Sequence, residues 1–283
     1  MTLYLVGTPI GNLEDMTFRA VRILQNVDRI ASEDTRHTAK LLQHFQITTP
    51  QISYHHHNRK SRTPELIALL LQGKSIALVT DAGMPTISDP GVDLVQEAIA
   101  HQIPVVPIPG VTAAITALAV SGLNSDRFVF EGFLPTKSKL RRELLQQLQG
   151  EVRTLIFYEA PHRLISTLED FLESFESDRT LVLARELTKL HEELWRGTLQ
   201  QALDYHQNRE PKGEYTIVLA GATQSETSYL NENQLKQELE RLTAQGMTLT
   251  QASRELTPFT TLSRREIYQL ALAKKFFAEG DRK

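Results

Sequence analysis

The chain has 283 residues, of which 41% are hydrophobic and 23% charged, and it carries a net charge of −3 and no cysteine. These values are typical of a globular protein with two modest domains, or with one large domain and an appendage, and they exclude disulfides, thiolate nucleophiles and cysteine-based metal sites. The first seven residues contain no basic segment and only a short apolar run. We therefore expect no signal peptide or membrane span and a cytoplasmic location.

Short β-rich runs alternate with helical runs over residues 1–122, which we expect to form a first α/β domain. The expected strands are 3–6, 29–32, 51–54, 75–80 and 105–108. A helix is expected to begin at Thr63, which can cap it, with Pro64 at the first helical position. Such alternation favours a mainly parallel sheet covered by helices.

The pattern changes over residues 123–221, where helical runs separate only some of the β-rich ones. The expected strands are 128–132, 154–159, 182–185, 192–197 and 215–220. Neighbouring strands joined by a short polar turn indicate antiparallel pairing, so we expect a second α/β domain with a mixed sheet.

A polar stretch, 222–233, is expected to be a linker to a basic helical C-terminal domain, 234–283, with helices near 234–242, 248–256 and 263–277. This last segment has nine Lys or Arg and six Asp or Glu, a net charge of +3, against −6 for the rest of the chain. Any contact with nucleic acid must therefore depend on local basic clusters.

Three loops that follow expected strands contain the glycines and prolines of a ligand site. They span 6–12, 80–91 and 107–114, and the second holds two glycines, two prolines and two aspartates. Most connections of this type have about two to six residues, and open α/β sheets bind ligands at the carboxyl ends of their strands. The first loop is not a G-x-G-x-x-G cradle because Pro9 occupies the turn, and no Walker lysine is present. We expect the three loops to line one crevice.

Two basic runs, 54–62 and 135–142, are candidate RNA contacts. The first contains three consecutive histidines, but alternate residues of a strand face opposite sides and no fourth ligand is evident, so we expect no metal site. Aromatic and imidazole planes beside cations suit RNA, whereas a charge run alone is also typical of a solvated surface. The candidate RNA-binding residues are His55, His56, Asn58, Arg59, Lys137, Arg141, Arg142, Arg185, Arg264 and Arg265. We expect the single tryptophan, Trp195, to pack in the core.

The loops also carry a resemblance. Together with the runs 32–36, 130–135, 158–163, 184–189 and 211–215, they resemble the motifs of the tetrapyrrole (corrin/porphyrin) methylase superfamily over nearly the whole chain. Within it they most resemble the branch that methylates a cytidine 2′-hydroxyl in 16S ribosomal RNA of the small subunit. Much of the superfamily has Gly-Asp-Pro in the second loop, and the Gly83-Met84-Pro85 found here favours the ribosomal branch.

The resemblance implies a two-domain tetrapyrrole-methylase-like fold that binds S-adenosyl-L-methionine between two α/β domains, and a homodimer that acts on the small ribosomal subunit. The cofactor-binding residues that it implies are Pro9, Gly83, Met84, Pro85, Ile87, Thr112, Ala113, Tyr158, Gly213 and Glu214. Two rival functions remain at this point. One is corrin or porphyrin C-methylation, and the other is a non-catalytic role in ribosome assembly.

Methylating a ribose hydroxyl requires in-line attack on a sulfonium methyl group, with a base or acceptor for the hydroxyl proton. The candidate bases are Glu33, Asp34, Asp81 and Glu159, and Arg36 and Lys189 are candidates for orienting the hydroxyl or a phosphate. For Glu33, Asp34 and Arg36 a helix cap with a local ion pair is an equal interpretation, and Asp81 can simply brace its loop. The sequence leaves the identity of the base open.

Overall fold

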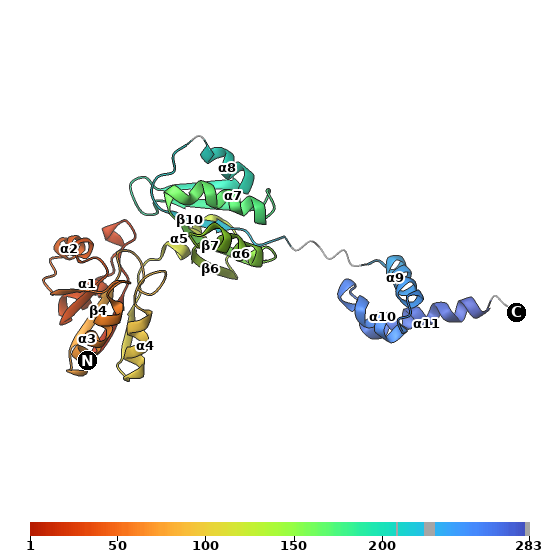
Figure 1. The fold of residues 1–283 in the computed structure, drawn as a ribbon, viewed down its shortest axis with the longest axis horizontal. Helices are drawn as coiled ribbons and strands as arrows, with labels where there is room; N and C mark the ends of the chain where they lie inside the picture. Colours follow the sequence, from red (N-terminus) through yellow and green to blue (C-terminus); the bar gives the residue numbers. More distant parts are fainter. Residues whose placement is uncertain (208, 224–229, 281–283) are drawn as a thin grey trace. The chain divides into compact units, whose positions relative to one another are not determined.

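The computed structural model describes residues 1–207, 209–223 and 230–280, with side chains through Leu272. These residues form two compact units, 1–222 and 223–283, and each unit is considered by itself. Unit 1 contains two sheets and the helices that cover them, whereas unit 2 is helical (Figure 1). In the part of the chain that the structure describes, no helix combines the length and apolar character needed to cross a bilayer.

The first sheet, predicted to be mainly parallel, is parallel throughout. Its five strands have the order β3-β2-β4-β1-β5. They are β1 (Thr2–Val6), β2 (Arg29–Ser32), β3 (Gln51–Ser53), β4 (Ser75–Val79) and β5 (Val105–Ile108). Because β1 pairs with both β4 and β5, the loops that leave these three strands emerge next to one another at the carboxyl edge of the sheet.

Helices cover both faces of this sheet. Successive residues of β4 alternate between the faces: Ala77 and Val79 pack with α1 (Phe18–Asn26) and α2 (Thr35–His44). Ile76 and Leu78 pack with α3 (Arg59–Leu71) and α4 (Val92–Ala100). A strand buried on both faces is continuously apolar, which is why β4 reads Ile-Ala-Leu-Val.

The start of α3 differs from the prediction, since the helix begins at Arg59 and Pro64 lies inside it. Asn58 organises the preceding turn: its Oδ1 accepts a hydrogen bond from the His55 amide at 2.8 Å, and its Nδ2 donates to the Ser53 carbonyl at 3.1 Å. The carbonyl of Asn58 then accepts from the amides of Ser61 and Arg62. With this turn before it, α3 begins about one helical turn earlier than the position of Pro64 indicates.

The second sheet is mixed, also as predicted, with the order β6-β7-β10-β8-β9. Its strands are β6 (Phe128–Phe133), β7 (Thr154–Glu159), β8 (Thr180–Arg185), β9 (Glu193–Thr198) and β10 (Tyr215–Leu219). Only β6 and β7 are parallel, and the other neighbours are antiparallel.

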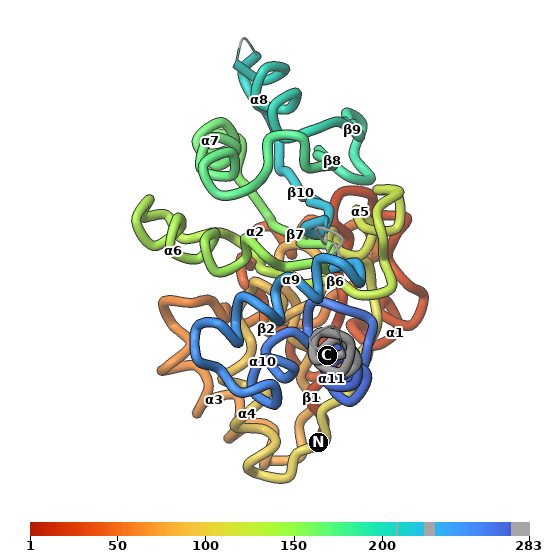
Figure 2. Tube along the Cα trace, turned by 90° about the vertical axis from the view of Figure 1, so that its right-hand side faces the viewer, coloured from red at the N-terminus to blue at the C-terminus, as the bar shows by residue number. Residues whose placement is uncertain are grey.

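One face of the second sheet packs against α6 (Ser138–Leu148), α7 (Leu164–Ser174) and α8 (Leu199–Gln207). Figures 1 and 2 show α7 and α8 side by side. The opposite face packs against α5 (Ala113–Ser121), whose Ala117 and Leu118 meet Ile156 and Val218. Thus α5 follows the last strand of the first sheet, and lies in the segment 1–122 expected to form the first domain, yet it completes the core of the second sheet. The predicted domain boundaries remain predictions.

Unit 2 contains α9 (Glu232–Ala244), α10 (Leu249–Leu256) and α11 (Arg264–Gly280), close to the predicted ranges. Two capping boxes start the first two helices, Asn231 with Gln234 and Thr248 with Gln251. Because Asn231 caps α9, the helix begins inside the segment that was expected to be linker.

Candidate active site

Three loops meet at the carboxyl edge of the first sheet, which confirms the predicted crevice. Thr8 and Gly83 exchange two backbone hydrogen bonds, of 2.9 and 3.0 Å, and join the loop after β1 to the loop after β4. A Cβ on Gly7 would lie 2.7 Å from the Cα of Gly110, so the loops after β1 and β5 touch backbone to backbone. Only glycine permits this approach.

The loop after β4 has an unusual backbone. Within nine residues, Gly83, Thr86, Ser88 and Gly91 have positive φ angles of 78°, 77°, 63° and 146°. Left-handed conformations cost residues such as Thr86 and Ser88 about 1 to 3 kcal/mol each and persist where the surroundings fix them, often at functional sites. The turns at Thr86 and Ser88 bring the second half of the loop back toward the sheet edge.

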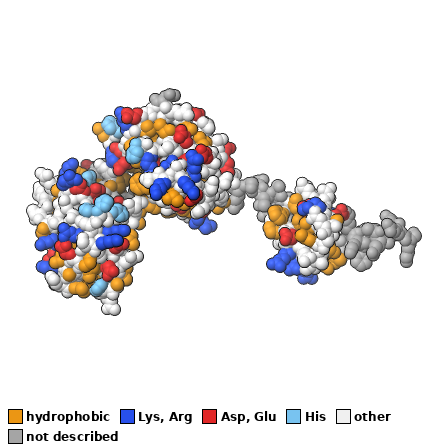
Figure 3. Space-filling model, in the orientation of Figure 1, with side chains coloured by type: hydrophobic (Ala, Val, Ile, Leu, Met, Phe, Trp, Pro, Cys, Tyr) orange, Lys and Arg blue, Asp and Glu red, His pale blue; other side chains and the backbone are white. Residues whose placement is uncertain are grey.

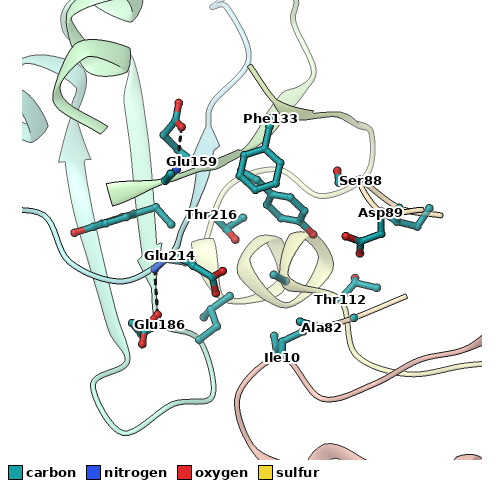
Figure 4. A pocket seen from close by; sticks show the side chains of 18 of the residues that line it. Ile10, Ala82, Ser88, Asp89, Thr112, Phe133, Glu159, Glu186, Glu214 and Thr216 are labelled. Atoms are coloured by element: carbon teal, nitrogen blue, oxygen red, sulfur yellow. Dashed lines mark hydrogen bonds between the residues drawn. The ribbon is translucent and has the colours of Figure 1, made fainter. Parts of the chain in front are cut away.

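A cavity of about 420 Å³ opens between these loops and the second sheet (Figure 4). Most of the predicted cofactor-binding residues line it, namely Gly83, Met84, Ile87, Thr112, Ala113, Tyr158 and Glu214. Sequence reasoning missed further lining residues, among them Ile10, Asp89, Phe133, Glu186, Leu187 and Thr216. Glu186 and Leu187 lie in a run that carried the resemblance, so that run was the available signal.

Pro9, Pro85 and Gly213 were predicted to bind the cofactor, but they do not line the cavity. Gly213 instead makes room for Glu186, whose side-chain carbons would lie 2.4 to 2.6 Å from a Cβ at that position. Its φ of 76° also favours glycine. Gly213 therefore shapes the wall without facing the cavity.

Lys189 lies at the cavity wall in an ion-paired cluster. Its Nζ donates to Glu186 at 2.8 Å and to Glu214 at 3.0 Å, and the Glu214 amide donates to Glu186 at 3.0 Å. Burial opposes the charge on Lys189, but the two carboxylates outweigh it and raise the pKa of the amine. Lys189 is therefore a fixed cation at the cavity wall.

Glu159, a candidate base, is a brace. Its side chain is buried, Oε2 accepts from the Thr167 hydroxyl at 2.6 Å, and Oε1 accepts from the Ala160 amide at 2.8 Å. Arg163 pairs with the same carboxylate at 3.3 Å. Figure 4 shows the side chain turned back onto the backbone. Since both oxygens are occupied, the structure argues against Glu159 as the base.

The other candidates, Glu33, Asp34, Arg36 and Asp81, lie beside the cavity but not in its lining. Asp34 caps α2 and pairs with Arg36 at 2.8 Å, which holds the pKa of its carboxyl well below the usual range. This is the cap interpretation. Asp81 accepts from the Asp34 amide at 3.2 Å, and Glu33 accepts from the Asp81 amide at 3.5 Å. Burial and the charge of Asp81 raise the pKa of Glu33.

Two of the candidate RNA-binding residues have structural partners. Arg141 is buried, and its guanidinium pairs with Asp170 at 2.5 Å. We therefore correct that assignment, because a buried, neutralised arginine is closed to RNA. Asn58 is committed to the turn before α3.

The remaining RNA candidates are more accessible. Arg142 is half exposed and pairs with Asp170 and Glu173, whereas Arg185 is mostly covered and pairs with Glu193. Arg59 pairs with Asp93 at 3.3 Å. Among the described residues, His56, Lys137, Arg264 and Arg265 are exposed and form no ion pair. Figure 3 shows histidines beside Lys and Arg on the lobe built on the first sheet.

Two further expectations concern His55 and Trp195. The His55 and His57 rings contact each other, but no group of three or more His, Asp or Glu in the described ranges is arranged to hold a metal ion. Trp195 packs partly buried against the core of the second sheet and contacts Tyr205, as predicted.

Unit 1 is an α/β unit with two sheets and a ligand cavity between them. This architecture is that of a two-domain tetrapyrrole-methylase-like fold, and comparison with known proteins gives the same result. The model of the Tetrapyrrole (Corrin/Porphyrin) Methylases matches residues 2–203, and the chain belongs to this family. Solved structures of the same fold include uroporphyrin-III-C-methyltransferase from Thermus thermophilus, with a TM-score of 0.57 at 22% identity over 77% of this chain and 93% of that one. The methyltransferase CobJ has a TM-score of 0.60 at 16% identity over 78% and 94%.

Curated relatives are much more similar in sequence. Ribosomal RNA small subunit methyltransferase I of Synechocystis sp. is 60% identical over 95% of this chain and 97% of its own length. The protein of the same name from Halalkalibacterium halodurans is 46% identical over 95% and 94%. That from Thermotoga maritima is 49% identical over 77% of this chain and 98% of its own length.

Proposed function

We propose that this protein transfers a methyl group from S-adenosyl-L-methionine to 16S ribosomal RNA of the small subunit, at the 2′-hydroxyl of a cytidine. The observation that carries the proposal is 60% identity over nearly the full length of both chains to a ribosomal RNA small subunit methyltransferase. The similarity to porphyrin and corrin enzymes is below 25% identity and concerns the fold alone.

The cavity fits such a cofactor. Apolar side chains of Ile10, Met84 and Leu187 line it together with the hydroxyl groups of Thr112 and Thr216. The close approach of Gly7 to Gly110 leaves backbone at the sheet edge, where a ligand can meet amide and carbonyl groups. These residues would hold the cofactor, which supplies an electrophilic methyl group on a sulfonium.

The residues of the chain then have to align the ribose hydroxyl and accept its proton. Alignment contributes much of the catalysis, because the leaving group is already activated. Lys189, fixed by Glu186 and Glu214 at the cavity wall, would orient a phosphate or hydroxyl. His55, His56, Arg59, Lys137, Arg142, Arg185, Arg264 and Arg265 are the proposed contacts to RNA, through phosphate charge and base stacking.

The test is transfer of labelled methyl from the cofactor to small ribosomal subunits from cells that lack this protein, with uroporphyrinogen III as the alternative acceptor. We expect label in the ribosomal RNA, and resistance of one phosphodiester to alkaline cleavage, which marks a 2′-O-methyl group. Label only in the porphyrinoid would overturn the proposal. Absence of cofactor binding in calorimetry would support the non-catalytic rival instead.

We further propose that the protein is a cytoplasmic homodimer. Helix α5 is apolar apart from Thr116 and Ser121, and Ile115, Ala119 and Val120 are exposed on the face opposite the second sheet. Such a face favours association with a second copy. Sedimentation at micromolar concentration should give a dimer, and Val120→Asp should shift it to monomer. A wild-type monomer would contradict the proposal. The cytoplasm is where ribosomal subunits assemble.

A further inference from the structure

Four carboxylates line the cavity: Asp89, Glu159, Glu186 and Glu214. Three of them already have cationic partners. Glu159 pairs with Arg163 and is buried, and Glu186 and Glu214 share Lys189. The oxygens of these three carboxylates are already engaged by protein groups, so they are less free to meet a substrate hydroxyl.

Asp89 is different. Among the residues that the structure describes, no Lys, Arg or His nitrogen lies within ion-pair distance of its carboxylate. Figure 4 shows the side chain directed from the loop after β4 into the space beside Ser88 and Thr112. Ser88, with its φ of 63°, sets this direction, since the chain turns there immediately before Asp89. The backbone strain of the loop thus serves to place one carboxylate.

The charges that face Asp89 are of the same sign. Burial raises its pKa, the carboxylates of Glu33, after β2, and Asp81, after β4, act in the same direction, and the polar Thr80 side chain acts against them, with a result of about 7. From the second sheet, the phenol of Tyr158 faces it, and burial together with Asp89 raises the pKa of that phenol. His55 and His56, after β3, act on Glu33 and lower its pKa.

We propose that Asp89 is the general base of the methyl transfer, and that Glu33 is a positioning residue that tunes it. The inference rests on the proposed function above. In the step, the O–H bond of the ribose 2′-hydroxyl breaks and its proton passes to the Asp89 carboxylate. The oxygen electron pair forms the new O–CH3 bond, and the S–CH3 bond breaks, leaving S-adenosylhomocysteine.

Two features of the site match this role. A general base works best when its protonation equilibrium lies near the operating pH, which is the consequence of a partly buried site with like-charged neighbours. Asp89 also belongs to the wall of the cavity itself, whereas Glu33 and Asp81 lie behind it. The two outer carboxylates therefore act on the reaction through Asp89.

The experiment uses the full chain, small ribosomal subunits that lack the modification, and labelled S-adenosyl-L-methionine. It compares wild type, Asp89→Asn, Glu33→Gln and the exposed control Glu97→Gln from pH 5.5 to 9. We expect wild-type kcat/KM to rise about tenfold per pH unit below pH 7 and then level off. Asp89→Asn should lower kcat about 10² to 10⁴-fold with cofactor affinity within about threefold, which is the usual range for loss of a general base.

Glu33→Gln removes one like charge, so the midpoint of the pH profile should move to lower pH with the plateau retained, and Glu97→Gln should match wild type. An Asp89→Asn protein with wild-type kcat and pH profile would overturn the inference, as would a loss of cofactor affinity equal to the loss of rate. If Asp89→Asn does not fold, an unshifted midpoint of the pH profile in Glu33→Gln would overturn the inference instead. Wild type that methylates no subunit at any pH would instead overturn the proposed function, and the assignment of Asp89 with it.

Discussion

The two sheets of unit 1 differ in whether the carboxylates near them have a cationic partner. Around the second sheet, buried or half-buried carboxylates have an arginine or lysine partner: Asp170 with Arg141, Glu159 with Arg163, and Glu186 with Lys189. At the carboxyl edge of the first sheet, Glu33, Asp81 and Asp89 lie close together with no such partner in the described ranges.

The difference separates scaffold from site. A buried ion pair holds its two side chains in one arrangement. Like charges without a partner at a partly buried edge instead raise one another's pKa values. They also destabilise the folded state, and favourable contacts elsewhere have to offset this cost. The loop after β4 adds backbone strain at the same place. Sites of chemistry are where such local conflicts are retained.

The largest effect is expected from breaking a pair on the scaffold side. Asp170→Ala leaves the buried Arg141 guanidinium without its partner and should lower the free energy of unfolding by about 3 to 5 kcal/mol. Urea unfolding measures it. The control is Arg142→Ala, which removes a half-exposed member of the same cluster and should cost below about 1 kcal/mol. Equal losses in the two variants would contradict the distinction between paired scaffold and surface charge.

The next largest effect is expected at the carboxyl edge of the first sheet, where the loops after β1 and β5 cross at Gly7 and Gly110. Gly7→Ala places a Cβ 2.7 Å from both the Gly110 Cα and the Met84 sulfur, so the loops must separate. Overpacking of this kind costs about 1 to 3 kcal/mol. Cofactor affinity measured by calorimetry should therefore fall about 5- to 150-fold.

Gly150→Ala is the matched control, because nothing lies within 4 Å of a Cβ there and its φ is not positive. Unchanged affinity in Gly7→Ala would mean that the cavity does not depend on this crossing.

Sequence reasoning predicted the architecture and the meeting of the loops because both follow from periodicity and from glycine and proline positions. It did not select Asp89. Asp81 and Asp89 lie in one loop, and the turns that aim Asp89 occur at Thr86 and Ser88, which carry no sequence signal for a left-handed backbone.

Sequence reasoning also did not distinguish Arg141 from Arg142, because both belong to the basic run 135–142 and both were predicted to contact RNA. A usable signal was present, because Arg141 lies one turn before Leu145 and both are buried on the same face of α6. The ion pair with Asp170 could not be read from the sequence, since the two residues are 29 positions apart.

A smaller effect should appear in stability at the acidic edge. Asp89 has its pKa raised from 3.8 to about 7 in the folded protein, so the native state binds the extra proton and is stabilised at low pH. That stabilisation is lost as pH rises from about 4 to 7. Asp89→Asn removes the charge, and at pH 8 it should raise the unfolding midpoint by about 2 to 4 °C, roughly 1 kcal/mol after allowance for partial exposure. Scanning calorimetry at pH 5 and pH 8 tests this, and a lower midpoint than wild type at pH 8 would contradict it.

The smallest effect on stability is expected at the rim of the same edge, where Arg36 is 89% exposed and pairs with Asp34. Arg36→Ala should change the free energy of unfolding by less than about 1 kcal/mol, because exposed ion pairs contribute little. Arg36 is also a candidate for orienting an RNA phosphate, and loss of one phosphate contact should lower the slope of log affinity against log salt by about 0.7 to 0.9. Filter binding of small-subunit RNA across a salt series measures that slope.

Lys74→Ala is the control, since Lys74 is also exposed and ion-paired, with Asp28, but precedes β4 at the opposite edge of the sheet. A slope reduced only in Arg36→Ala would show that RNA approaches the unpaired edge, whereas equal slopes in both variants would contradict a role of Arg36 in orienting a phosphate.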